Sequence, residues 1–337
     1  MDVPMPTLII WRHGHLNRLD KGSAFAVAAI RNFLQKYWLA LFLAVSVGYI
    51  VFYIVDQLGQ LQGAISVSPL SLVASFIFQV AFWVVASHLW STALYAVSGV
   101  KVGITDCFFQ LCLVNLGKYI PGKVWGVVAR ASYCEQRHGI DIGRNLQATY
   151  IEQIYLIGSA AILAALIVAA LESNLVYWVI APMIAVTIII ATVYQRPLLF
   201  LIRLLNRLRR QETDIEISEF HVSPGLMVRL LMQYLVVWVL LGCVMYGIYL
   251  ALYPAQLSVH MAAVITLSCV VGISVGFLAV FAPGGVGVRE AVSAVILAEY
   301  MPLADTVLLV LVFRLWLAAL EVLVGGGLYL RMRSRMG

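Results

Sequence analysis

Two short stretches of this sequence place a helix break and charged side chains inside very apolar surroundings. The first is YIPGKVWGVVAR at residues 119–130 and the second is FAPGGVGVRE at residues 281–290, with their Pro-Gly pairs 162 residues apart. Each has an aromatic and an aliphatic residue, then Pro-Gly, then a short apolar run with further glycine before an arginine. Because proline lacks a backbone donor and glycine admits positive φ, each stretch predicts a broken helix with unpaired backbone groups.

The first stretch carries residue types that bind an anion. A helix that starts after Pro121 and Gly122 presents free N–H groups and the positive end of its dipole. Lys123, Arg130 and Arg137 follow at seven-residue spacing, which places them in one stripe along such a helix. Phosphate is the natural ligand for this arrangement. The alternative is that these cations only mark a cytoplasmic turn and extend their long side chains toward the membrane surface.

A second group of charged residues lies in or beside apolar segments, where each costs at least about 2.5 kcal/mol. Arg289 and Glu290 point about 100° apart on a helix, so we expect them to seek different partners. Arg314 and Glu321 share one helix face, but their Cα atoms would be about 10.5 Å apart, too far for an easy direct pair. Together with Glu152, these residues form either intramembrane ion pairs or a polar path, and the sequence leaves both open.

The composition requires a membrane protein. Of 337 residues, 63% are hydrophobic and only 11% are charged, and the mean hydropathy is +0.96, which no water-soluble domain tolerates. We therefore expect an all-α polytopic membrane protein with anionic lipids, and no nucleic acid, as partners. The five cysteines show no CxxC spacing and are interpreted as apolar packing residues. The sequence contains no P-loop, HExxH or GxSxG motif and no metal-ligand spacing, so we expect no catalytic motif, cofactor or metal.

Seven apolar runs are long enough to cross a hydrocarbon core, which takes about 20 helical residues. They lie at about 38–55, 70–98, 147–170, 175–194, 227–252, 260–282 and 303–330. Two further apolar stretches, 105–120 and 287–300, have only about 14 to 16 residues and are too short to cross easily. The sequence therefore predicts about seven or eight transmembrane helices and two broken or re-entrant elements.

The basic residues are distributed so that one side of the membrane is strongly positive. Of the 22 lysines and arginines, five precede residue 38, six lie in 99–145, six lie in 195–229 and three follow residue 330. The positive-inside rule then places both termini and both internal basic regions in the cytoplasm of a bacterial-type plasma (inner) membrane. The count closes only if 105–145 enters and leaves from inside and 260–300 from outside. This pattern predicts an inverted repeat whose breaks meet near the midplane.

The membrane domain is expected to span residues 38–330, with a basic cytoplasmic segment, 1–37, before it and a cytoplasmic tail, 331–337, after it. The first segment lacks the apolar run and small-residue cleavage site of a signal peptide, so we expect it to be retained. Residues 195–226 form a cytoplasmic connection in which leucine and arginine recur at helical spacing. This pattern fits an amphipathic helix at the membrane surface, with a solvated basic loop as the alternative.

The stretches NLGKYIPGKVWGVVAR and APGGVGVREA resemble the lysylphosphatidylglycerol synthase transmembrane-region family, a flippase-like domain found alone or fused to an aminoacyl-transferase. The matching residues are Lys118, Pro121, Gly122 and Lys123 in the first stretch and Pro283, Gly284, Gly285, Gly287, Arg289 and Glu290 in the second. The resemblance implies two inverted repeats with re-entrant helices and the handling of lipids with charged head groups. With Arg130, these residues are the candidate phosphate-binding set. No aminoacyl-transferase domain is present in these residues, so we do not expect synthesis of a lysyl-lipid.

Three functions fit the sequence, and the first is favoured. The protein could translocate a phosphate-bearing lipid, such as a phospholipid, a polyprenyl-phosphate or a glycolipid, between leaflets. It could instead be a membrane glycosyltransferase or lipid-modifying transferase that uses Glu290 or Glu152 as a base. The first outer loop offers only Asp56 for such chemistry, which argues against a transferase. The third function is an accessory subunit that acts beside a glycosyltransferase in a cell-envelope glycolipid pathway.

Overall fold

The computed structural model describes residues 68–117, 125–194, 222–253, 257–279 and 282–333, all of which belong to one compact unit. The predicted span at 38–55 lies outside the described residues, as do most of the connection at 195–226 and the first Pro-Gly pair. The described parts are entirely helical and contain no strand. The helices are α2 (Pro69–Ser98), α3 (Ile104–Gly117), α4 (Trp125–His138), α5 (Ile142–Glu172), α6 (Leu175–Tyr194), α8 (Pro224–Leu252), α9 (Val259–Leu278), α10 (Val288–Leu297) and α11 (Leu303–Arg333).

Six of the described helices are long and apolar enough to cross a membrane: α2, α5, α6, α8, α9 and α11. They coincide with six of the seven predicted spans, so an all-α polytopic membrane protein is confirmed. The two short apolar stretches also remain short, since α3 has 14 residues and α10 has 10. A ten-residue helix rises only about 15 Å, roughly half of the hydrocarbon core.

The ends of the long helices follow local sequence signals. Ser68 caps α2 and Ser223 caps α8, and in each case proline occupies the first helical turn, where its missing N–H costs nothing. The Asp141 side chain caps α5 in the same way. At its other end α2 stops at Gly99, which adopts the left-handed conformation typical of helix C-termini.

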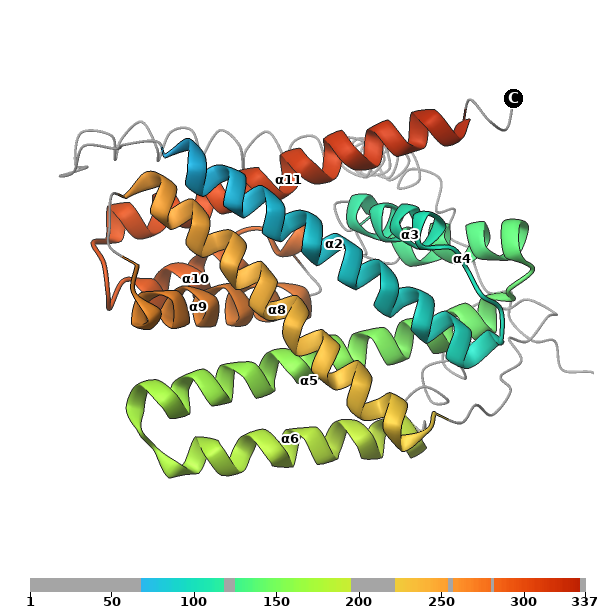
Figure 1. The fold of residues 1–337 in the computed structure, drawn as a ribbon, viewed down its shortest axis with the longest axis horizontal. Helices are drawn as coiled ribbons and strands as arrows, with labels where there is room; N and C mark the ends of the chain where they lie inside the picture. The colour runs from blue at the N-terminus through green and yellow to red at the C-terminus, as the bar shows by residue number, and fades with distance from the viewer. Residues whose placement is uncertain (1–67, 118–124, 195–221, 254–256, 280–281, 334–337) are drawn as a thin grey trace, which may run out of the picture. The chain divides into compact units, whose positions relative to one another are not determined.

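Helices α2 and α8 lie side by side and run in opposite directions (Figure 1). The Ser68 N–H donates to the Ala251 carbonyl at 3.0 Å near the start of α2. Further along α2, the Ser75 hydroxyl donates to the Val244 carbonyl at 3.2 Å. Because the α8 residue number falls as the α2 number rises, the two helices are antiparallel.

The same antiparallel relation extends to two sets of four helices, α2–α5 and α8–α11. In each set a long helix is followed by a helical hairpin, α3–α4 or α9–α10, and then by another long helix. Contacts between the sets are reciprocal, because α3 packs against α11 and α5 packs against α9. Since α2 and α8 are antiparallel, this arrangement is that of an inverted repeat, as the sequence predicted.

Candidate functional site

The second break is a run of glycines in conformations that other residues rarely adopt. Gly284, Gly285 and Gly287 have φ values of 61°, 69° and 82°. A Cβ at Gly285 would also lie 2.7 Å from the backbone oxygen of Gly276 on α9. The chain can therefore turn from α9 into α10 within a few residues because these positions carry no side chain.

Small residues on α9 let α10 pack against it at very short range. A Cβ at Gly272 would clash with the Ser293 hydroxyl, and a Cβ at Gly276 would lie 2.7 Å from the Arg289 Cβ. Ser268 and Ser293 also exchange hydrogen bonds, each hydroxyl donating to the other residue's backbone carbonyl. The four-residue spacing of Ser268, Gly272 and Gly276 is the small-residue stripe typical of close helix pairs in membranes. This stripe fixes the first turns of α10.

Three charged side chains meet at the start of α10, and we call Arg289, Glu290 and Arg314 the Arg-Glu-Arg cluster. The Arg314 Nη1 on α11 donates to the Glu290 Oε1, and the Arg289 Nε lies 3.6 Å from the same oxygen. The other carboxylate oxygen accepts a hydrogen bond from the backbone N–H of Gly287 at 2.6 Å. The prediction that Arg289 and Glu290 seek different partners is wrong, because the long Arg289 side chain folds back toward its neighbour.

The Arg-Glu-Arg cluster carries an excess of positive charge in a sheltered position. The side chains of Arg289, Glu290 and Arg314 are 15%, 15% and 11% exposed. Two guanidinium groups face one carboxylate, so one positive charge is left over. The positive end of the α10 dipole adds to this charge. The arrangement therefore attracts an anion, and it remains partly open to one.

The first hairpin also depends on glycine. A Cβ at Gly126, near the start of α4, would lie 2.8 Å from the Val114 Cα on α3, and Gly117 faces Gly126 across the pair. The predicted phosphate-binding residues Lys118, Pro121, Gly122 and Lys123 lie outside the described residues. Their role remains a prediction.

Arg130 on α4 is enclosed completely. Its side chain is 0% exposed, and its Nη2 donates to the Glu152 Oε2 and to the Thr149 Oγ1, each at 2.8 Å. The Trp90 ring of α2 lies over the guanidinium, with its centroid 3.6 Å from the Cζ. A cation that is both paired and stacked in this way links α2, α4 and α5.

Some polar atoms around Arg130 have no hydrogen-bond partner. Within the part of the chain that the structure describes, these include the Arg130 Nε and Nη1 and both side-chain polar atoms of Asn145, which is also 0% exposed. Buried donors and acceptors of this kind are usually satisfied by ordered water or by a ligand. The predicted phosphate role of Arg130 therefore remains a prediction, and Glu152 already occupies one of its donors.

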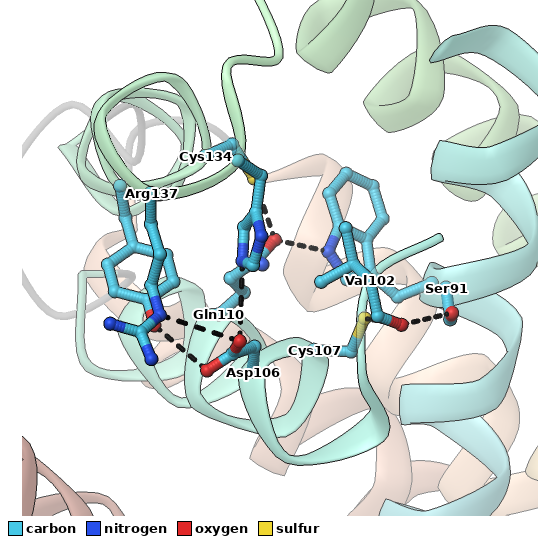
Figure 2. Close-up of polar contacts among 10 residues, drawn as sticks. Ser91, Val102, Asp106, Cys107, Gln110, Cys134 and Arg137 are labelled. Carbon is cyan, nitrogen blue, oxygen red and sulfur yellow. Dashed lines mark hydrogen bonds and ion pairs between the residues drawn. The ribbon is translucent and has the colours of Figure 1, made fainter. Parts of the chain in front are cut away.

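Arg137, the third member of the predicted cationic stripe, has a different environment from Arg130. Its side chain is 50% exposed, and its Nε lies 3.5 Å from the Asp106 Oδ2 near the start of α3, as Figure 2 shows. The Tyr133 hydroxyl donates to the same carboxylate, and the His138 Nε2 lies 3.4 Å from it. Burial lowers the pKa of His138, although the Asp106 carboxylate partly opposes this shift. Asp106 thus ties the outer end of the α3–α4 hairpin together.

Deeper in the same hairpin, Gln110 joins three helices. Its Oε1 accepts hydrogen bonds from the Trp90 Nε1 at 2.6 Å and from the Cys134 Sγ at 2.9 Å (Figure 2). Trp90 therefore contacts α3 through its edge and Arg130 through its face. The sequence interpretation missed Trp90, Gln110, Thr149 and Asp106, because no spacing in the sequence connects them.

The comparison with known families agrees with this architecture. The family described as "Lysylphosphatidylglycerol synthase TM region" matches residues 37–325, which is most of the chain and includes both breaks. The chain belongs to this family. No curated protein matches it. The resemblance inferred from the two Pro-Gly stretches is thereby confirmed.

In this member of the lysylphosphatidylglycerol synthase transmembrane-region family, the two hairpins carry ion pairs of opposite polarity. Arg130 of α4 pairs with Glu152 of α5, and Glu290 of α10 pairs with Arg314 of α11. Glu152 and Arg314 are separated by 162 residues, as are the two Pro-Gly pairs. The two repeats thus use one position for an intramembrane ion pair, with the charges exchanged.

The other residues of the predicted polar path do not form a continuous line with these pairs. Arg314 pairs with Glu290 rather than with Glu321, as the helix geometry predicted. The Glu321 carboxylate is instead close enough to act electrostatically on Cys112 of α3. Of the two alternatives left open for these charges, ion pairing is therefore what the described contacts support for Arg130, Glu152, Glu290 and Arg314. Among the described residues no group of three or more His, Cys, Asp or Glu side chains could hold a metal ion.

Proposed function

We propose that this protein binds a phosphate-bearing lipid at the Arg-Glu-Arg cluster and moves it between the two leaflets. The observation that carries the proposal is the charge imbalance of the cluster, where Arg289 and Arg314 share a single carboxylate at the start of α10. A lipid phosphate supplies the missing negative charge. Its acyl or prenyl chains can remain in the bilayer that surrounds the helices.

The energetics favour a working role for this charge. An arginine at the centre of a membrane helix costs about 2.5–3.5 kcal/mol on insertion scales. Glu290 offsets this cost for one guanidinium, which leaves the second without a full partner in the cluster. A charge-assisted hydrogen bond to a phosphate contributes about 1.5–3 kcal/mol, enough to offset the remaining cost.

The architecture supports movement as well as binding. Discontinuous helices at the interface of inverted repeats are where many transporters hold their substrates. Both hairpins here are of that type, and each is tied to the following long helix by one intramembrane ion pair. Breaking one pair and keeping the other gives two different arrangements of the same helices. Such a change is a route to alternating access from the two leaflets.

We further propose that both termini face the cytoplasm of a bacterial-type inner membrane, with anionic lipids as the partners. The support is the distribution of lysine and arginine, which avoids the segments 56–69, 171–174 and 253–259. A glycosyltransferase or other lipid-modifying enzyme could act on the lipid that this protein delivers.

The test is leaflet exchange in vesicles that contain the purified protein. Labelled phospholipids and a labelled polyprenyl-phosphate are placed in one leaflet, and the rate at which each label reaches the other leaflet is measured. We expect faster exchange of at least one phosphate-bearing lipid than in protein-free vesicles. Equal rates with and without protein, for every lipid in the set, would contradict the proposal. Product formed from a polyprenyl-linked sugar, and lost in Glu290→Gln, would favour the transferase instead.

A further inference from the structure

The Glu290 carboxylate occupies the position at which an anionic ligand would bind. Its Oε2 accepts the backbone N–H of Gly287 at the N-terminus of α10, and its Oε1 accepts from Arg314 and lies 3.6 Å from Arg289. A helix N-terminus and two guanidinium groups are the donors that proteins use for phosphate. Here those donors surround a side chain of the same protein.

We infer that Glu290 is the resident anion of the lipid site, which a phosphate monoester head group displaces on binding and which displaces that head group again on release. The inference rests on the proposed lipid-binding function and adds the class of head group and the way the site empties. A lipid phosphate must compete with a carboxylate that is attached to the site and so pays no entropy of association. The competition sets a threshold that weak anions do not pass.

The chemistry of the two anions selects the head group. A phosphodiester has one negative charge and two free oxygens, as a carboxylate has, so it offers the donors no more than Glu290 already provides. A phosphomonoester carries a charge of about −1.5 to −2 at pH 7 and three acceptor oxygens. The monoester can therefore satisfy Arg289 as well as Arg314, and it can also use the excess positive charge of the cluster. A diphosphate group meets the same requirement.

Glu290→Gln separates this role from ordinary helix capping. The glutamine amide oxygen can still accept the Gly287 N–H, so the cap at the start of α10 is kept. The negative charge is lost, and the competitor for the two guanidinium groups is lost with it. A capping residue would show little change, whereas a resident anion would show tighter lipid binding and slower release.

The experiment titrates the purified full-length protein in detergent with phosphatidic acid, a monoester, and with phosphatidylglycerol, a diester of the same acyl chains. Native mass spectrometry measures the fraction of protein with lipid bound. For the wild type we expect phosphatidic acid to bind at least about tenfold more tightly. For Glu290→Gln we expect phosphatidic acid to bind about ten- to a hundredfold more tightly than to the wild type, as one charge-assisted hydrogen bond is worth. In vesicles, leaflet exchange of phosphatidic acid by this variant should be slower, because no internal anion expels the lipid.

Glu299→Gln is the matched control, because it removes an exposed carboxylate just beyond the end of α10. It should leave both affinities and the exchange rate at wild-type values. Glycerol 3-phosphate, which carries the same group without acyl chains, tests whether the ligand is a lipid. Competition by glycerol 3-phosphate at concentrations similar to those of phosphatidic acid would overturn a lipid ligand in favour of a soluble phosphate.

The outcomes distinguish this inference from the proposed function. If the wild type binds and exchanges lipid but Glu290→Gln has unchanged or weaker affinity, or exchanges lipid faster, then Glu290 is not a resident anion, and the lipid function stands. Equal wild-type affinity for the monoester and the diester would overturn the head-group class. If the wild type neither binds nor exchanges any phosphate-bearing lipid, the proposed function itself fails.

Discussion

Replacing Glu152 with glutamine should destabilise the protein strongly, because it leaves a buried charge without its counter-ion. The Arg130 side chain is 0% exposed, and Glu152 is the acid that pairs with it among the described residues. Removing one partner of a buried ion pair costs about 3–5 kcal/mol, since the other charge stays in a poorly solvated place. The Trp90 ring and the Thr149 hydroxyl remain in contact with Arg130, so we expect a loss near the lower end, about 3 kcal/mol.

Arg137→Gln is the comparison for this change, because it removes a cation one helical stripe away on the same helix. Its side chain is 50% exposed, and its contact with Asp106 is 3.5 Å long. Pairs of this kind contribute at most about 1 kcal/mol. The two variants therefore separate an enclosed ion pair from a surface one.

The assay is reversible unfolding of the purified protein in mixed micelles with increasing denaturing detergent, followed by the helical circular dichroism signal. The expected result is a large loss of unfolding free energy for Glu152→Gln and a loss below about 1 kcal/mol for Arg137→Gln. A Glu152→Gln protein as stable as the wild type would refute the reasoning. It would mean that Arg130 is solvated or has another partner.

Three further predictions concern the breaks and the topology. Gly284→Leu and Gly285→Ala should reduce lipid exchange out of proportion to expression, because φ is 61° and 69° at these positions; Gly225→Ala, at a glycine with open space around it, should not, and full activity in both break variants would mean that the break is only a turn. Single-cysteine labelling on a cysteine-free background should reach Ser68, Asn174 and Ser258 from outside and Arg137 and Gln211 only from inside; labelling of Gln211 from outside would contradict the inverted repeat. Lys123→Gln should weaken lipid binding about ten- to a hundredfold if the first break holds a phosphate, whereas Arg207→Gln with Arg209→Gln on the basic connection should leave specific binding nearly unchanged, and equal losses would mean that bulk charge explains both.

The membrane spans could be predicted from the sequence because each needs only length and apolar composition. The helix α5 spans Ile142–Glu172 and contains the predicted run at 147–170, and the short α3 and α10 were recognisable by the same measure. The Pro-Gly pairs located the breaks, because proline and glycine act on their own backbone. Inverted symmetry followed from counting basic residues on the two sides.

The partners of the charged residues could not be predicted, because they depend on how the helices are rotated against one another. Arg130 and Arg137 are in one stripe of α4, yet one is enclosed by Trp90 and the other is half exposed. Trp90 is 40 residues before Arg130 in the sequence, and no periodic pattern relates them. The pairing of Arg289 with Glu290 was missed for another reason, since helix geometry fixes the Cβ directions but not the ends of long side chains.

The most direct test of the central claim is the rate of leaflet exchange for a phosphate-bearing lipid in Arg289→Gln, compared with Arg137→Gln and wild type. The first variant removes the excess positive charge of the Arg-Glu-Arg cluster and keeps the pair between Glu290 and Arg314, so the helices should remain folded. The second variant removes one cation elsewhere in the same domain. The account predicts that exchange falls about tenfold or more in Arg289→Gln and stays at the wild-type rate in Arg137→Gln. Equal rates in all three proteins would contradict it.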